Sequence, residues 1–177
     1  MEEKVSVWKA NLTNGIILGL LSIVYTLVLY FLDMTFNKSL GYIFMVVQIG
    51  ILFYMLKSYR DTYLHGYMTY GQSLGAGVVI ILYSTILATI FSYILYKFID
   101  TGLTGKILAI TEEGMAKRGL PQEQIDAGMA MSKKMFTPGF MVISGFLLSM
   151  LFGTITSLLV SIFTRKEGNP LVEPPVR

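Results

Sequence analysis

The fold is decided by the stretch Gly139–Thr164, GFMVISGFLLSMLFGTITSLLVSIFT, which contains no charged residue. A helix crosses the roughly 30 Å hydrocarbon layer of a membrane with about 20 apolar residues, so this stretch is long enough to span it. A small residue recurs at every fourth position: Gly145, Ser149, Gly153, Ser157 and Ser161. The stretch therefore predicts a membrane-spanning helix with small side chains along one face, on which another helix can approach closely.

The composition of the whole chain indicates the same class of protein. Of the 177 residues, 54% are hydrophobic and only 14% are charged, whereas soluble domains carry about 25% charged residues. So few charges cannot cover a surface that faces water on all sides. The chain is predicted to be an all-α membrane protein with the lipid bilayer as its main partner, and its net charge of +3 is assigned to anchors beside the spans and not to nucleic-acid binding.

The spans themselves are located by four runs without Asp, Glu, Lys or Arg. These runs are 10–32, 39–56, 62–96 and 135–164, and each has room for one crossing. The predicted spans are 14–32, 40–56, 74–98 and 140–163. The first is expected to be retained and not removed as a signal peptide, because its apolar run is long and no small-residue cleavage site follows it.

The longest polar segment joins the third and fourth spans. Its sequence predicts an extramembrane αα-hairpin over residues 103–136, interrupted at Gly119-Leu120-Pro121, because glycine suits a helix end and proline the first turn of the next helix. Glu113 and Lys117 stand in the favourable i, i+4 order on the first of these helices. Residues 1–166 are expected to form a single four-span domain, followed by a disordered tail over 167–177.

The orientation is predicted from the positions of lysine and arginine, which are enriched in cytoplasmic segments. Four spans place both termini on one side, and seven basic residues fall on each side. Those directly next to span ends favour the side of the termini, which has Lys57, Arg60, Arg165 and Lys166 there. We therefore expect both termini in the cytoplasm and the hairpin outside.

Small residues at helical spacing also occur in two other spans. Gly15 and Gly19 form a short pair in the first span, and Ser84, Ala88 and Ser92 form a row in the third. Close packing between spans of the same chain is the simplest interpretation of these rows and of the longer row in the fourth span. A homo-oligomer or an interface with another membrane protein is the alternative.

Gln48 is a side-chain amide near the middle of the second span. A buried amide in lipid requires a hydrogen-bonding partner, and Thr154 or Thr156 of the fourth span are the expected partners. A contact to a substrate or an ion is the alternative interpretation. No Asp, Glu, Lys, Arg or His lies at the middle of any span, which disfavours proton-coupled transport, voltage sensing and intramembrane proteolysis.

The residues needed for other chemistry are missing or badly placed. The chain has no cysteine and one histidine, which excludes thiol catalysis, thiolate metal sites and a histidine metal cluster. The glycine-rich segment 71–77 lacks the Lys-Ser/Thr of a phosphate-binding loop. We expect no catalytic, cofactor-binding or metal site.

The order of these features resembles a family of small four-helix membrane proteins from Bacteroidota, known as a domain of unknown function. The matching motifs are 59–61 (YRD), 66–72 (GYMTYGQ), 119–121 (GLP) and 135–139 (MFTPG). The resemblance extends from about Lys9 to Lys166, although Thr101 stands where a proline would be expected. It implies a protein of the inner membrane of a Gram-negative bacterium and supplies no activity.

The functional hypothesis is a non-enzymatic, multi-pass protein of the inner (cytoplasmic) membrane. It would act as a structural or accessory subunit that engages a membrane-protein partner through the fourth span or through the methionine-bearing hairpin. The alternative is a small homo-oligomeric pore or transport component, with Gln48 and the hydroxyl residues of the fourth span along a polar path. Neither hypothesis requires a cofactor.

Overall fold

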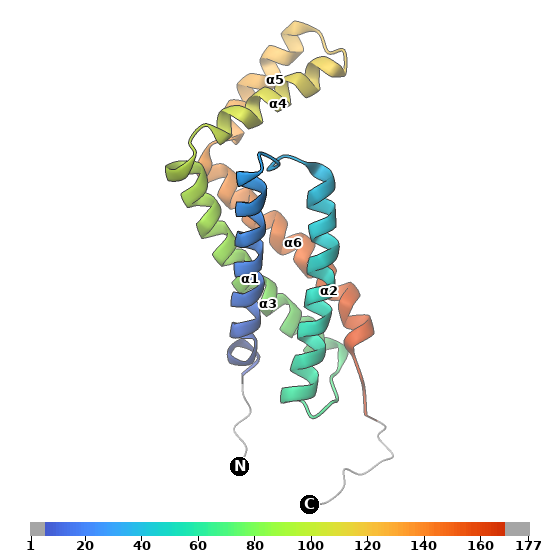
Figure 1. The fold of residues 1–177 in the computed structure, drawn as a ribbon. Coiled ribbons are helices and arrows are strands. Elements are labelled where there is room, and N and C mark those ends of the chain that lie inside the picture. Colours follow the sequence, from blue (N-terminus) through green and yellow to red (C-terminus); the bar gives the residue numbers. More distant parts are fainter. Residues whose placement is uncertain (1–5, 169–177) are drawn as a thin grey trace, which may run out of the picture. The chain divides into compact units, whose positions relative to one another are not determined.

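The computed structural model describes residues 6–168, and over this range it is all-α (Figure 1). No strand occurs in this part of the chain apart from an isolated two-residue bridge. The predicted all-α fold is confirmed, whereas most of the predicted disordered tail, residues 169–177, lies outside the described range. The elements in order are α1 Val7–Phe31, α2 Lys38–Tyr63, α3 Tyr70–Ile94, the π-helix η1 Leu95–Ile99, α4 Leu103–Lys117, α5 Gln122–Met135 and α6 Pro138–Thr164.

Four of the helices are long and apolar enough to cross a membrane. They are α1, α2, α3 together with η1, and α6. Each coincides with one predicted span, although α1 begins seven residues before residue 14 and α2 continues seven residues beyond residue 56. The prediction of four long apolar helices is therefore confirmed, and their crossing of a membrane stays a prediction.

The chain forms two compact units. Unit 1 consists of Met1–Leu87 and Ser149–Arg177, and unit 2 consists of Ala88–Leu148. Because α3 and α6 run through both units, this division leaves the prediction of one domain over residues 1–166 open.

Unit 1 has a core in which α3 occupies the central position. Ala76 and Ile80 of α3 are fully buried, together with Leu56 of α2. The faces of the helices that point away from this core carry large exposed apolar side chains, such as Phe163, which is 74% exposed. Apolar side chains on such a face are in their preferred environment when lipid surrounds them.

The helices α1 and α2 pack against each other within unit 1. The rings of Tyr25 and Phe44 stack with centroids 4.0 Å apart, and the Tyr25 hydroxyl donates to the backbone oxygen of Leu40 at 2.8 Å. Asn37 caps α2, because its side-chain oxygen accepts from the backbone nitrogen of Ser39 at 3.0 Å. The start of α2 is thereby fixed both by its own cap and by a side chain of α1.

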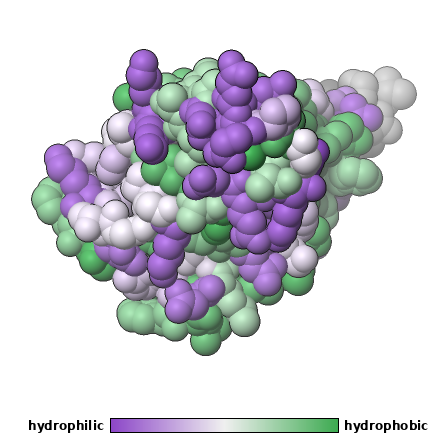
Figure 2. Space-filling model, turned by 90° about the horizontal axis from the view of Figure 1, so that it is seen from above, coloured by the Kyte–Doolittle hydropathy of each residue, from purple (hydrophilic) through white to green (hydrophobic). Residues whose placement is uncertain are grey.

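Unit 2 contains the predicted helical hairpin. The helices α4 and α5 pack side by side (Figure 1), and Gly119 adopts a left-handed φ of 72° between them. Met115 of α4 lies directly over Gly128 of α5, where a Cβ would come within 2.9 Å of the methionine Cε. The face shown from above in Figure 2 has hydrophilic side chains interspersed with hydrophobic ones. The two-helix hairpin is confirmed, and its location outside the bilayer stays a prediction.

Candidate functional site: a polar junction of α2, α3 and α6

The main concentration of side-chain hydrogen bonds in unit 1 lies where α2 and α6 end and α3 begins. We call this set of residues the polar junction: Arg60, Asp61, Met68, Thr69, Gln72, Ser73, Thr164 and Lys166. Arg60 and Asp61 are in the last turn of α2, and Thr164 is the last residue of α6. The segment 68–73 leads into the first turn of α3.

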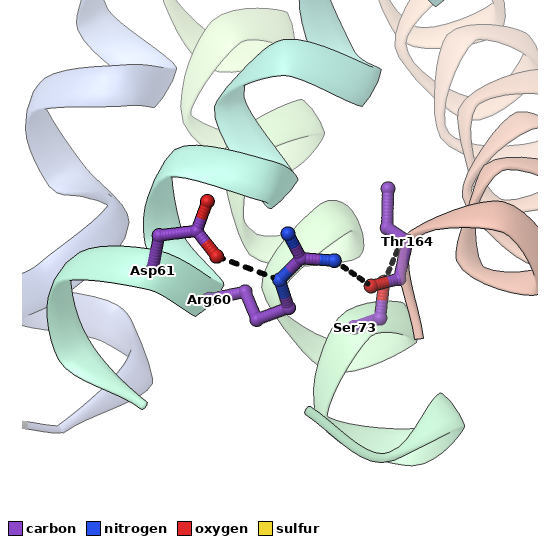
Figure 3. Close-up of polar contacts among 4 residues, drawn as sticks. All are labelled: Arg60, Asp61, Ser73 and Thr164. Atoms are coloured by element: carbon purple, nitrogen blue, oxygen red, sulfur yellow. Dashed lines mark hydrogen bonds and ion pairs between the residues drawn. The ribbon is translucent and has the colours of Figure 1, made fainter. Parts of the chain in front are cut away.

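Arg60 links the ends of two helices (Figure 3). Its Nε donates to Asp61 Oδ1 at 2.8 Å, and its Nη1 donates to the backbone oxygen of Thr164 at 3.2 Å. The last carbonyl groups of a helix have no partner within the helix and carry partial negative charge. Arg60 therefore satisfies the C-terminus of α6 with a positive charge, while its side chain is only 14% exposed.

A buried pair of hydroxyl groups lies beside this contact. Ser73 Oγ and Thr164 Oγ1 are 2.6 Å apart, and both residues are buried. Thr164 Oγ1 also donates to the backbone oxygen of Val160 at 3.2 Å, which uses its one proton and leaves Ser73 as the donor to Thr164. This bond joins the first turn of α3 to the last turn of α6.

The start of α3 is closed by a reciprocal cap. Thr69 Oγ1 accepts from the backbone nitrogen of Gln72 at 3.3 Å, and Gln72 Oε1 accepts from the backbone nitrogen of Thr69 at 2.8 Å. This is the capping box of a Thr-x-x-Gln sequence. The adjacent Met68 exchanges two backbone hydrogen bonds of 2.9 Å with Lys166, so the chain leaving α6 is tied to the loop before α3.

These contacts explain what the polar junction does physically. It satisfies backbone groups at two helix ends, the C-terminus of α6 and the N-terminus of α3, which would otherwise be costly to leave unpaired near lipid. Asp61 is the acidic residue of the set, and no group of three or more His, Cys, Asp and Glu residues within 6–168 is arranged to hold a metal ion. The contacts of the polar junction therefore hold the ends of helices in place, and the surface of the junction has more positive than negative charges.

The predicted small residues of α1 lie against α3. A Cβ on Gly15 would overlap the side chain of Tyr83 and would lie 3.0 Å from the backbone oxygen of Ile80. A Cβ on Gly19 would come within 2.9 Å of Leu87 Cδ1. Both glycines thus allow α1 to approach the backbone of α3 closely.

The predicted row on α6 divides into two parts. In unit 1, a Cβ on Gly153 would overlap Ile81, and Ser157 Oγ lies 2.5 Å from the place of a Cβ on Gly77. Ser157 and Ser161 are fully buried, and neither hydroxyl has a hydrogen-bond partner among the described residues. In contrast, a Cβ on Gly145 would meet nothing within 4 Å, and Ser149 is exposed.

Gln48 has a different partner from those expected. Its Nε2 donates to Ser22 Oγ of α1 at 3.0 Å, and not to Thr154 or Thr156. Thr154 instead donates to the backbone oxygen of Met150 at 2.8 Å within its own helix. A threonine that is satisfied locally in this way has no proton left for a neighbouring helix.

Comparison with known proteins identifies one family. The family described as "Protein of unknown function (DUF4199)" matches residues 13–166. The chain belongs to this family. The predicted membership in a family of unknown function is confirmed, and the predicted bacterial group stays a prediction. The description of the DUF4199 family names no activity. No curated protein and no solved structure matches the chain.

The polar junction gathers the residues of two of the sequence motifs that suggested this family. Arg60 and Asp61 belong to the motif at 59–61, and Thr69 and Gln72 belong to the motif at 66–72. The role of the second motif is visible in the sequence, because Thr-x-x-Gln before an apolar run is a recognisable capping signal. The pairing of Ser73 with Thr164 had no comparable signal, since it depends on how α3 and α6 meet.

Proposed function

We propose that this DUF4199 protein is a non-enzymatic integral membrane protein that serves as a structural or accessory subunit for a membrane-protein partner. The observation that carries this proposal is the use of the polar groups in unit 1. Gln48 bonds to Ser22, Ser73 to Thr164, and Arg60 to Asp61 and to Thr164. Groups that are engaged in holding helices together are not placed to act on a substrate.

The exposed apolar surfaces of α6 and of the hairpin are suited to contact with a partner. Leu151, Phe152 and Leu159 of α6 are each more than half exposed, which suits contact with lipid or with another membrane helix. On the hairpin, Met131 is 65% exposed and Met135 40%. Methionine is unbranched and adapts its shape to varied surfaces, as interaction sites require.

We further propose that the protein lies in the inner membrane with both termini in the cytoplasm and the hairpin outside. The basic residues that follow the charge-free runs of α2 and α6, Lys57, Arg60, Arg165 and Lys166, support this orientation. A reporter enzyme that is active only in the cytoplasm, fused after Arg177, should be active. Activity of a reporter that works only outside the cytoplasm would contradict the orientation.

The accessory role is tested by affinity capture of the full chain from its own membranes in a mild detergent. Wild type is compared with Met131→Ser/Met135→Ser and with Met45→Ser, which changes an exposed methionine on α2 as a matched control. A partner that is retained by wild type and by the control but lost by the hairpin variant supports the proposal.

The alternative hypothesis, a small pore, is tested by a different experiment. Ser157 and Ser161 are fully buried, so in this arrangement they are not available to a solute. Liposomes containing the purified chain should therefore not leak small solutes. Flux that disappears on Gln48→Leu would contradict the accessory role and favour a pore.

A further inference from the structure

The surface of the polar junction has unbalanced positive charge. In and directly beside the junction, the segments 57–61 and 165–167 contain the cations Lys57, Arg60, Arg165 and Lys166 and the carboxylates Asp61 and Glu167, which gives a surplus of two positive charges. Arg60 pairs with Asp61 at 2.8 Å, and Lys57 and Lys166 both lie near enough to Asp61 to interact with its charge. One carboxylate is thus shared by three cations from α2 and from the segment after α6.

The three cations are held in different ways. Arg60 uses Nε and Nη1 for Asp61 and Thr164, and its remaining nitrogen, Nη2, makes no bond to the other residues drawn in Figure 3. The ammonium group of Lys166 lies over the ring of Tyr67, 5.6 Å from its centroid. Lys57 stands one turn before Arg60 on α2 and is exposed. Arg60 and Lys166 are therefore held in place by their contacts, whereas the exposed side chain of Lys57 can adjust its position.

The cluster lies where the apolar parts of α2 and α6 end. The charge-free runs 39–56 and 135–164 end immediately before Lys57 and Arg165. On the apolar side of this boundary, Tyr54 is 71% exposed and Phe163 is 74% exposed. A ligand with a negative head and two apolar tails would match both sides of the boundary, whereas a free anion or a nucleotide would use only the charged side.

We propose that Lys57, Arg60 and Lys166 form a binding site for the phosphate group of an anionic phospholipid. The lipid tails lie along the exposed apolar faces of α2 and α6, and the phosphate accepts hydrogen bonds from Arg60 Nη2 and from the two ammonium groups. The proposal requires only that the chain spans a membrane. It is independent of any protein partner.

The test is native mass spectrometry of the full chain in uncharged detergent micelles. Phosphatidylglycerol and phosphatidylcholine with identical tails are titrated in parallel. Each basic residue close to an anionic lipid is expected to strengthen binding about fivefold, so two lysines give a preference of about thirtyfold for phosphatidylglycerol. The preference should vanish in Lys57→Gln/Lys166→Gln. Arg60 is kept in this variant because it holds the end of α6, and its charge is balanced by the ion pair with Asp61.

Three comparisons make the result decisive. Lys133→Gln/Lys134→Gln on the hairpin removes the same charge and should keep the preference, as should the charge-preserving Lys57→Arg/Lys166→Arg. If the double glutamine variant does not fold, Lys57→Gln and Lys166→Gln alone should each reduce the preference about fivefold. Excess inorganic phosphate should leave the lipid bound. An unchanged preference in the glutamine variants, or displacement of the lipid by inorganic phosphate, would overturn the proposal.

Discussion

Ser157 Oγ of α6 lies 2.5 Å from the position that a Cβ on Gly77 of α3 would occupy, and the Ser157 Cβ lies 3.1 Å from it. The two helices therefore meet with no space for a larger side chain at residue 77. In lipid, where apolar burial gives little drive for helices to associate, such close packing is a main source of stability. This contact makes α3 the helix against which α6 is fitted in unit 1.

The first prediction concerns this contact. Gly77→Ala should lower the free energy of unfolding by about 1–3 kcal/mol, because the added methyl group overpacks the interface. The measurement is a titration with sodium dodecyl sulfate in mixed micelles. Gly75→Ala is the matched control, since a Cβ there meets nothing within 4 Å, and it should be neutral or slightly stabilising. Equal losses in both variants would contradict the assigned contact, and Ser157→Gly should restore part of the stability of Gly77→Ala.

The second prediction separates the two parts of the α6 row. Gly153→Leu should abolish the folded monomer, because the new side chain would overlap Ile81. Gly145→Leu should leave the monomer folded, since its Cβ position is open. Size-exclusion chromatography with light scattering distinguishes these results. A folded monomer of Gly153→Leu that has lost only an oligomer would show that this part of the row faces another chain.

The third prediction concerns Arg60. Arg60→Gln should cost about 2 kcal/mol, because hydrogen bonds from a charged donor to a carbonyl oxygen are among the stronger ones and the Thr164 carbonyl is left without this donor. Asp61→Asn should change the stability little, since Asp61 is exposed. Hydrogen exchange of the last turn of α6 should accelerate in the first variant and not in the second. The reverse order would show that the ion pair, and not the helix end, is what Arg60 stabilises.

The fourth prediction is the coupling between Gln48 and Ser22. Their hydrogen bond of 3.0 Å should give a coupling free energy of about 0.6 kcal/mol in a double-mutant cycle with Gln48→Leu and Ser22→Ala. The same cycle between Gln48→Leu and Thr154→Val should give no coupling. A coupling to Thr154 would mean that α2 faces α6 and not α1 at this depth.

The fifth prediction concerns pH and the hairpin. The hydrogen bond and the charge of Lys117 lower the pKa of Glu113 below its ordinary value. A group with a lowered pKa in the folded state adds stability above its unfolded pKa and loses it as the pH falls through the folded pKa. Lys117→Met should therefore raise the pKa of Glu113, which carboxyl-carbon NMR of the labelled chain can follow. An unchanged pKa would show that the pair does not form in solution.

The four spans were predictable because length and charge alone decide them. A run such as 135–164, without one ionisable residue, has only one stable environment. The hairpin was predictable for a related reason: the Gly119-Leu120-Pro121 break separates two stretches that are each long enough for a helix. In both cases the information is local in the sequence.

The partners of the polar side chains were not predictable, because they depend on how each helix is rotated about its axis. Gln48 can reach either neighbour from the middle of α2, and only the fold selects Ser22. The row on α6 likewise indicated a close contact without naming Gly77 and Ile81 of α3. The capping box of Thr69 and Gln72 is local and could have been recognised from its spacing.

The most direct measurement is a disulfide bond between the two helix ends of the polar junction. The chain has no cysteine, so Ser73→Cys/Thr164→Cys introduces the only pair. The oxygens that they replace are 2.6 Å apart, close to the sulfur–sulfur bond length of about 2.05 Å. Mild oxidation in membranes should link the two cysteines within one molecule, and Ser73→Cys/Ser149→Cys, whose α6 residue lies about 22 Å along the helix from Thr164, should form no such link. A link between two molecules, with none inside one, would contradict the account that α3 and α6 are joined here within a single chain.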